Sequence, residues 1–234
     1  MVVLFILSLI SLLTLVVLSL FRNESRRRFV AKLVTSLLFI IMAIAIVIEN
    51  NFPFENEYCW GIIVALCIAF LGDFALGQYH IANHKLIVKS KTFWQGLGFI
   101  FFSLAQIFFI VNFMTLYKFH VAFLLIPFVL ITGAIAIIAN LKVFDKKMTL
   151  LAITYSTLLS FMVASTVNAA YVLNFNSLGI VLLIAGVSFA ISDFTLIFKY
   201  YYHKARIFTT VTSTVTYYVA QFLFAYSIYF YIFG

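Results

Sequence analysis

The sequence predicts an all-α, polytopic membrane protein with eight transmembrane helices and with its N-terminus and C-terminus outside. Its 234 residues are 65% hydrophobic and only 9% charged, which is far from the composition of a soluble domain. Apolar runs recur along the whole chain, and basic residues fall at regular intervals between them. The connections are short, so residues 1–234 are expected to form a single integral membrane domain.

In the first half of the chain, four runs have about the 20 residues that a helix needs to cross a bilayer. The first has no basic residue before it and no small-x-small cleavage site after it, so it is expected to be retained rather than removed as a signal peptide. The runs are 2–21, 30–48, 58–77 and 97–117.

The second half repeats this arrangement with four further apolar runs of similar length. Each is separated from its neighbour by only a few polar residues, which leaves no room for an extramembrane domain. These runs are 120–141, 149–172, 177–198 and 207–232.

Charge gives the orientation, because basic residues concentrate in cytoplasmic loops. Fourteen of the fifteen Lys and Arg residues fall in the odd-numbered loops, and Lys118 is the exception. The second loop carries Glu49, Glu55 and Glu57 without a basic residue. Basic loops beside anionic lipid account for the net charge of +8, so no nucleic-acid partner is expected.

Two aspartates lie inside predicted spans. Asp73 and Asp193 each follow a small residue and precede Phe-x-Leu, 120 residues apart. A carboxylate at membrane depth is costly and is usually retained for chemistry, ion movement or a fixed partner. Both are expected about one turn from the cytoplasmic end of their spans, where the helix dipole disfavours an anion.

A glutamine follows each aspartate in the next span, in Ala105-Gln106 and Ala220-Gln221. The offset is 115 residues, against 120 for the aspartates. This indicates a 4+4 parallel internal repeat, and chance self-similarity among so many apolar residues is the alternative. Gln106, Tyr217 and Gln221 are either substrate contacts or interhelical hydrogen-bonding residues.

One predicted helical face carries possible metal ligands. Asp73, His80 and His84 share that face, but the sequence supplies no convincing further ligands. Neither a metal nor an organic cofactor is expected.

Several stretches together resemble the YhhN-like lysoplasmalogenase family of eight-span membrane proteins. They are Gly-Asp-x-x-Leu at 72–76, Phe-x-x-Gly at 93–96 leading to Gln106, the Tyr-to-Met helix at 155–162, Phe-x-x-Ser-Asp at 189–193, and Tyr-Tyr-x-Ala-Gln at 217–221.

The resemblance implies hydrolysis of the vinyl ether bond of lysoplasmalogens to a fatty aldehyde and glycerophosphocholine or glycerophosphoethanolamine. Asp73 and Asp193 would then be catalytic, with the choice of acid left open, and Gln106, Tyr217, Tyr218 and Gln221 would bind the lysophospholipid. The family usually has His at the position of Gln106. An amide does not titrate near neutrality, so Gln106 can orient a substrate but cannot transfer its proton.

The residues themselves fit this chemistry. A vinyl ether is cleaved by protonation of its β-carbon, which calls for one carboxylic acid and one carboxylate. The positive N-termini of spans 97–117 and 207–232, with Lys91, Lys204 or Arg206, could receive the phosphate.

Two other interpretations remain open. Paired intramembrane acids also suit a small proton-coupled transporter. A purely structural protein requires each aspartate to pair with a loop lysine. The short loops and many Phe, Ile and Lys residues favour a bacterial inner membrane, and the sequence leaves the oligomeric state undetermined.

Overall fold

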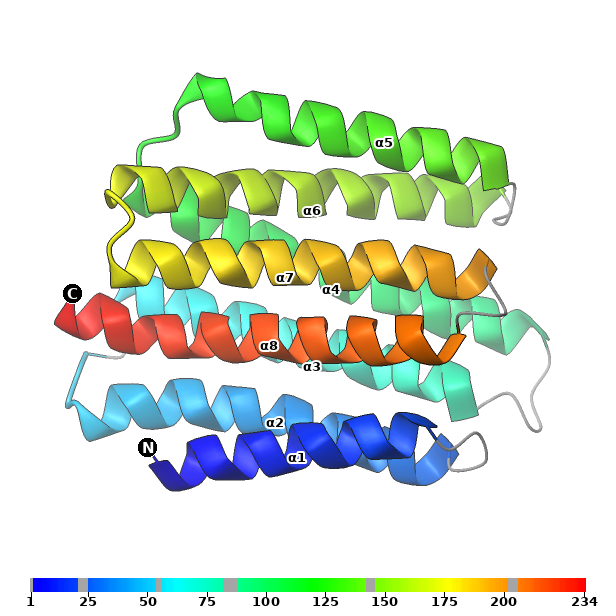
Figure 1. Cartoon of the computed structure of the whole chain (residues 1–234), viewed down its shortest axis with the longest axis horizontal. Helices are drawn as coiled ribbons and strands as arrows, with labels where there is room; N and C mark the ends of the chain where they lie inside the picture. The colour runs from blue at the N-terminus through cyan, green and yellow to red at the C-terminus, as the bar shows by residue number, and fades with distance from the viewer. Residues whose placement is uncertain (1, 21–24, 54–55, 82–87, 142–145, 202–205) are drawn as a thin grey trace.

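The computed structural model describes residues 2–20, 25–53, 56–81, 88–141, 146–201 and 206–234. Within these ranges the chain forms α-helices and one short 3-10 helix, and no strand (Figure 1). The elements are α1 (Val2–Leu20), α2 (Ser25–Glu49), α3 (Glu57–Ile81), α4 (Val88–Leu116), η2 (Val121–Leu124), α5 (Leu125–Leu141), α6 (Lys146–Val172), α7 (Ser177–Tyr201) and α8 (Arg206–Phe233).

Successive helices run in opposite directions across the molecule. Both termini lie at one end, and the C-terminal ends of α1, α3, α5 and α7 lie at the other (Figure 1). This is the arrangement that the charge pattern predicts for a multi-pass membrane protein. Which end faces the cytoplasm stays a prediction.

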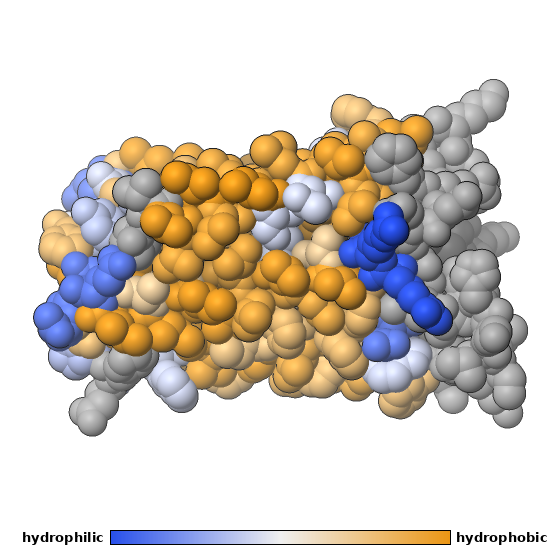
Figure 2. Space-filling model, turned by 90° about the horizontal axis from the view of Figure 1, so that it is seen from below, coloured by the Kyte–Doolittle hydropathy of each residue, from blue (hydrophilic) through white to orange (hydrophobic). Residues whose placement is uncertain are grey.

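Seven of the described helices are long and apolar enough to cross a membrane. The expected eighth span, 120–141, is different: it starts with the 3-10 turn η2, and its described apolar part, Val121–Ile137, is shorter. Figure 2 shows a broad apolar band across one face of the molecule, with polar residues toward its ends. The chain is therefore an integral, multi-pass membrane protein, and α5 is not among the seven described helices that are long enough to span a membrane.

The helices that contain the two aspartates are longer than expected. We predicted that these spans end near Gly77 and Phe198, but α3 and α7 each continue for eight residues beyond their aspartate. Hydropathy marks the apolar stretch, whereas the helical backbone continues through the polar residues that follow. The aspartates are thus not in the last turn, and the helix dipole acts on them only weakly.

Matching asparagines start these two helices. The Asn56 side-chain oxygen accepts hydrogen bonds from the backbone N–H groups of Tyr58 and Cys59, at 3.1 and 3.3 Å. Asn176 accepts one from Gly179 at 2.9 Å. Such N-caps satisfy backbone donors that a helix otherwise leaves free. Each cap lies seventeen residues before the aspartate of its helix, so both aspartates occupy the same helical register.

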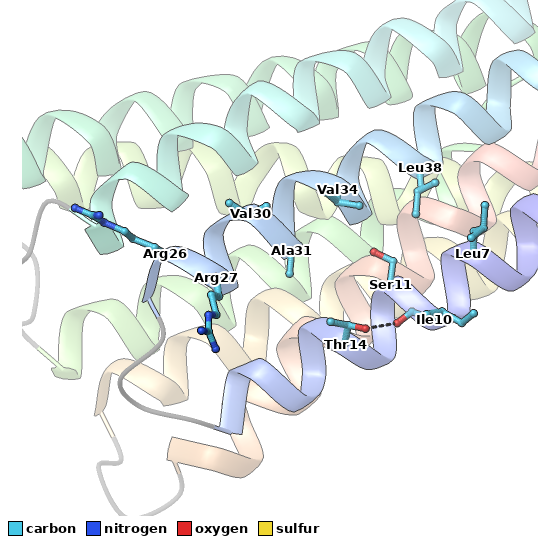
Figure 3. Close-up of a pocket in the computed structure, with 10 residues that line it drawn as sticks. All are labelled: Leu7, Ile10, Ser11, Thr14, Arg26, Arg27, Val30, Ala31, Val34 and Leu38. Carbon is cyan, nitrogen blue, oxygen red and sulfur yellow. Dashed lines mark hydrogen bonds between the residues drawn. The ribbon is translucent and has the colours of Figure 1, made fainter.

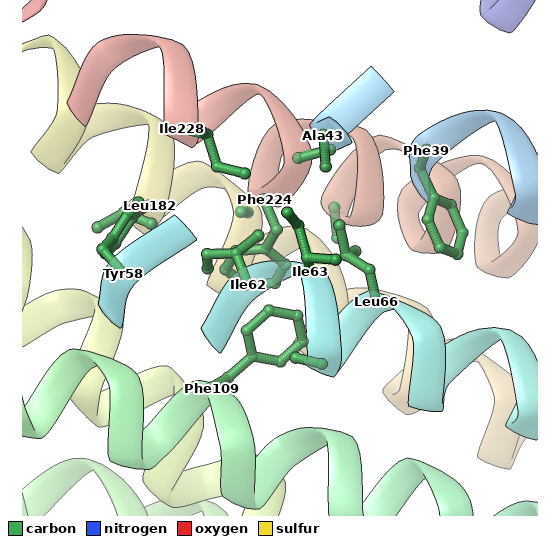
Figure 4. Packing of buried hydrophobic residues seen from close by; sticks show 14 of the residues in the cluster. Phe39, Ala43, Tyr58, Ile62, Ile63, Leu66, Phe109, Leu182, Phe224 and Ile228 are labelled. Carbon is green, nitrogen blue, oxygen red and sulfur yellow. The ribbon is translucent and has the colours of Figure 1, made fainter. Parts of the chain in front are cut away.

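The main core lies between the central helices and is rich in aromatic side chains (Figure 4). Its buried members come from every helix except α5, which contributes only the partly buried Ile126. Phe109 of α4 stacks on Phe224 of α8 with ring centroids 4.3 Å apart. The centre of the bundle is therefore closely packed, and α5 lies at its edge.

Close approach of α6 and α7 gives a first testable prediction. A Cβ atom added at Gly186 would lie 2.2 Å from the Thr166 Oγ1, which donates a hydrogen bond to the Val163 carbonyl. We expect Gly186→Ala to destabilise the protein by roughly 1–3 kcal/mol, as overpacking usually does. Thermal unfolding in detergent measures the effect.

Gly133 of α5 is the matched control, since an added Cβ there meets nothing within 4 Å. Gly133→Ala should leave the unfolding midpoint unchanged or raise it slightly. Equal midpoints for the two variants would contradict the close α6–α7 contact.

Candidate active site

Asp73 is a buried carboxylate whose two oxygens both have partners. Its side chain is 1% exposed. The Lys32 Nζ of α2 lies 2.9 Å from Oδ1. The hydroxyls of Ser36 and Tyr217 donate to Oδ2 at 2.6 and 2.8 Å. One cation and two hydroxyl donors thus surround this buried side chain.

Tyr218 contacts the two α2 residues that bind Asp73. Its hydroxyl lies 3.1 Å from the Ser36 Oγ and also 3.1 Å from the backbone carbonyl of Lys32. Ser36 has a single hydroxyl proton and donates it to the Asp73 carboxylate. The Tyr218 hydroxyl donates to the Lys32 backbone carbonyl of α2. Tyr218 is 1% exposed, so it fixes the position of Lys32 and Ser36.

Asp193 has different surroundings. The Tyr155 hydroxyl of α6 is hydrogen-bonded to its Oδ2. Among the residues that the structure describes, no cation forms an ion pair with it. Its side chain is partly exposed rather than buried. Asp193 therefore has less compensation for a negative charge than Asp73 and is more accessible to a ligand.

Tyr155 connects the two aspartates. Its hydroxyl is bonded to Asp193, and Asp73, Gln106 and Tyr217 lie near it. Asp73, Asp193, Tyr155, Gln106 and Tyr217 form the polar cluster of this region. That the two aspartates act in one site at a common depth stays a prediction.

Gln106, a member of this cluster, and Gln221, one helical turn after Tyr217 on α8, are unusual. Both side chains are 0% exposed, and neither amide has a hydrogen-bonding partner among the described residues. An unpaired buried amide costs roughly 1–3 kcal/mol, so such groups need an explanation. A bound water or the polar part of a substrate would supply the missing partners.

Aromatic rings enclose the cluster. The Tyr217 ring meets Phe102 edge-on at 5.9 Å and Phe189 at 5.6 Å. Phe99 lies 5.6 Å from Tyr155. These rings exclude water, which strengthens the electrostatic interactions inside the site. They also offer an apolar surface to a hydrocarbon chain.

Gly72 allows one of these rings to approach. A Cβ atom at this position would lie 2.9 Å from the Phe102 ring. The small residue before Asp73, noted as part of a repeated motif, therefore has a packing role beside the site.

Some predicted features lie outside the described part of the chain. Nothing is described for the side chains of Lys91, Lys204 and Arg206, which were expected to receive a phosphate, or for those of His80 and His84. The Thr157 and Thr214 hydroxyls donate to carbonyls of their own helices, at 2.9 and 2.7 Å, which agrees with a structural role for them.

Three members of the site were not singled out from the sequence. Lys32 was grouped with the loop residues, although it lies within the apolar helix that spans Arg26–Glu49. Ser36 lies one helical turn after Lys32 and therefore on the same face of α2, and it is a second polar residue that could have indicated the site. Tyr155 was noted only as part of a family motif.

The ion pair gives a second prediction. Lys32→Met should lower the free energy of unfolding by roughly 1–3 kcal/mol, because the Asp73 anion stays buried without its cation. Lys32→Met combined with Asp73→Asn should lower it by less than the sum of the single effects, as a double-mutant cycle in detergent would measure.

Lys118→Met is the control, since Lys118 is exposed at the opposite end of the bundle. Strictly additive effects of the two substitutions would show that Lys32 and Asp73 do not interact in solution.

The described site can be compared with known proteins. The chain matches the model of the YhhN family over residues 27–228. Neither a curated protein nor a solved structure matches it. The matched region contains both aspartates and every residue of the cluster, and it leaves out α1. Because the match covers most of its length, the chain belongs to the YhhN family.

Proposed function

We propose that this protein hydrolyses the vinyl ether bond of lysoplasmalogens and releases a fatty aldehyde and a glycerophospho-headgroup. The observation that carries the proposal is the pair of intramembrane aspartates in unlike surroundings: Asp73 has the Lys32 cation beside it, whereas the described contact of Asp193 is the Tyr155 hydroxyl. Membership of the YhhN family and the motifs quoted above support it. We further propose a bacterial inner membrane as its location.

The unlike surroundings suggest how the two carboxyl groups divide the work. Asp73, held by Lys32, Ser36 and Tyr217, remains a carboxylate. Asp193, with no described cation beside it, holds a proton at lower cost and acts as the general acid. Pairs of acids whose environments separate their protonation states are typical of ether and acetal hydrolysis.

The reaction then proceeds in two steps. Asp193 transfers its proton to the β-carbon of the vinyl ether, which leaves an oxocarbenium-like cation on the α-carbon and oxygen. The negative charge of Asp73 stabilises this cation. Asp193, now a carboxylate, accepts a proton from the water that attacks the α-carbon. The resulting hemiacetal breaks down to the aldehyde and the alcohol of the glycerol moiety.

Gln106 and Gln221 are proposed to bind the polar part of the lysophospholipid or the attacking water. Their four unpaired side-chain atoms support this role. Tyr217 positions the Asp73 carboxylate directly, and Tyr218 positions its partners on α2. The rings of Phe99 and Phe102 are proposed to contact the hydrocarbon chain. No step requires a metal or organic cofactor.

The decisive experiment is aldehyde release from a lysoplasmalogen by the detergent-purified protein. Asp193→Asn keeps the size of the side chain but cannot donate the proton, so we expect a loss of about 10²–10⁴-fold in rate. Asp73→Asn should also reduce the rate strongly, because the oxocarbenium-like cation then lacks the negative charge that stabilises it.

Glu57→Gln serves as the control, since Glu57 is an exposed acid at the other end of α3. Its activity should equal that of the unaltered protein. Undiminished aldehyde release by Asp193→Asn would overturn the assignment of the acid. No release by a folded, monodisperse parent protein would overturn the proposed activity.

The glutamines give a further prediction in which stability and activity change in opposite directions. Gln106→Leu removes two unpaired buried polar atoms, so it should raise the free energy of unfolding by about 1 kcal/mol. The same substitution should lower aldehyde release. Thermal unfolding and the aldehyde assay measure the two effects.

Gln95→Leu is the matched control, because Gln95 is a half-buried glutamine of the same helix. It should change neither quantity appreciably. A Gln106→Leu protein that is both less stable and fully active would show that the amide is structural.

We also propose that the eight helices all cross the membrane as a 4+4 parallel repeat. Residues 115 positions apart meet across the centre of the bundle: Phe102 contacts Tyr217 and Phe109 contacts Phe224. Gln106 and Gln221, also 115 apart, lie between these pairs on α4 and α8. In addition, α4 packs on α6 while α8 packs on α2, as a pseudo-two-fold axis requires.

A proton-coupled transporter is the second candidate. The intramembrane pair of Lys32 and Asp73 favours it, because transporters use such pairs as proton relays. Proteoliposomes with an internal pH dye distinguish the two functions: a hydrolase releases aldehyde without proton flux, and a transporter moves protons without cleaving the lipid.

A further inference from the structure

A shallow groove runs along the outside of the bundle between α1 and α2, away from the aspartates. It encloses about 640 Å³, which is within the usual range of ligand pockets. Figure 3 shows its lining residues in two rows, one along each helix. They are Leu7, Ile10, Ser11 and Thr14 of α1, and Arg26, Arg27, Val30, Ala31, Val34 and Leu38 of α2.

The walls of the groove are apolar. The two hydroxyls in it are already engaged: Ser11 lies 2.7 Å from the Thr35 Oγ1, and Thr14 donates to the Ile10 carbonyl at 2.8 Å. The remaining lining between the arginines and Leu38 is aliphatic. A hydrocarbon chain fits such walls better than a polar ligand does.

One end of the groove is strongly positive. Arg26 and Arg27, both exposed, are the second and third residues of α2, so they lie beside the positive N-terminal pole of that helix (Figure 3). This end lies on the side of the molecule where α1, α3, α5 and α7 end (Figure 1). Guanidinium groups at a helix N-terminus suit a phosphate.

The length of the groove fits a lipid of one leaflet. Arg27 and Leu38 are eleven residues apart on α2, or about 16 Å along the helix. Half of the hydrocarbon core of a bilayer is about 15 Å thick. With the arginines at headgroup level, the aliphatic part of the groove therefore extends to the middle of the membrane.

We propose that the α1–α2 groove binds one anionic phospholipid of the membrane, with its phosphate on Arg26 and Arg27 and an acyl chain between the two helices. The site is separate from the aspartates, because Lys32 and Ser36 of α2 point to Asp73 while Ala31 and Val34 line the groove. It also involves α1, which lies outside the residues matched by the YhhN family. The bound lipid fastens this peripheral helix to α2.

Binding and photolabelling with defined lipids test the proposal. The probes are phosphatidylglycerol and phosphatidylcholine with identical acyl chains, added to the delipidated protein and followed by native mass spectrometry. We expect phosphatidylglycerol to bind more tightly. Arg26→Gln with Arg27→Gln should weaken its binding about thirtyfold, since each basic residue near a membrane surface contributes about 1 kcal/mol. Lys118→Gln, which removes an exposed charge at the other end, should have no effect.

A phosphatidylglycerol with a diazirine on its acyl chain locates the site. The label should fall on residues 7–14 and 30–38, and Ala31→Trp should abolish it by filling the groove. Ala134→Trp on α5 is the matched control and should leave the label in place. Equal affinity for the two lipids, unchanged binding by the double arginine variant, or labelling spread evenly over all helices would overturn the proposal. The binding test uses the arginine variants alone, so it stands even if Ala31→Trp fails to fold, and the unfolding midpoint of the double arginine variant shows that it is folded.

Discussion

The buried ion pair between Lys32 and Asp73 is the constraint on which the site depends. A carboxylate that is 1% exposed at membrane depth is stable only with close compensation, and here α2 supplies a cation at 2.9 Å and α8 a hydroxyl. These contacts fix the order of α2, α3 and α8 around the charge. The hydrogen bonds of Tyr218 to α2 then hold the lysine and the serine in place.

The surroundings of the second aspartate are partly similar to those of the first. Each carboxyl group receives a hydroxyl from the helix that precedes its own, Ser36 of α2 for Asp73 and Tyr155 of α6 for Asp193. The residue 120 positions after Lys32 is Ala152, which carries no charge. The described difference between the two sites is therefore the lysine that α2 brings to Asp73.

The sequence predicted the architecture well because its signals are strong and local. Long apolar runs predict the order of the eight helices, and alternating basic loops agree with their alternating direction. The ends of α2, α3, α4 and α7 differ from the predicted spans, and the predicted span 120–141 is a 3-10 turn followed by a shorter helix. The repeated motif in the sequence also located both aspartates. Their partners could not be predicted in this way, because Lys32, Ser36 and Tyr155 contact them from other helices, and hydropathy says nothing about which faces meet. Lys32 was the hardest to assign, since a lysine near the start of a span resembles a loop residue.

The unpaired glutamines bear on function more directly than the paired aspartates do. A buried ion pair or a hydroxyl bonded to a carboxylate also occurs in purely structural bundles, so the Asp73 network alone is compatible with stability. The serine and threonine hydroxyls of these helices mostly find backbone partners, as Ser160 and Thr216 do at 2.6 and 2.8 Å. Among the described residues Gln106 and Gln221 have none, and a leucine of similar size would fill their space without an unpaired amide. Packing alone does not account for these two amides, and the proposed binding of a polar group does.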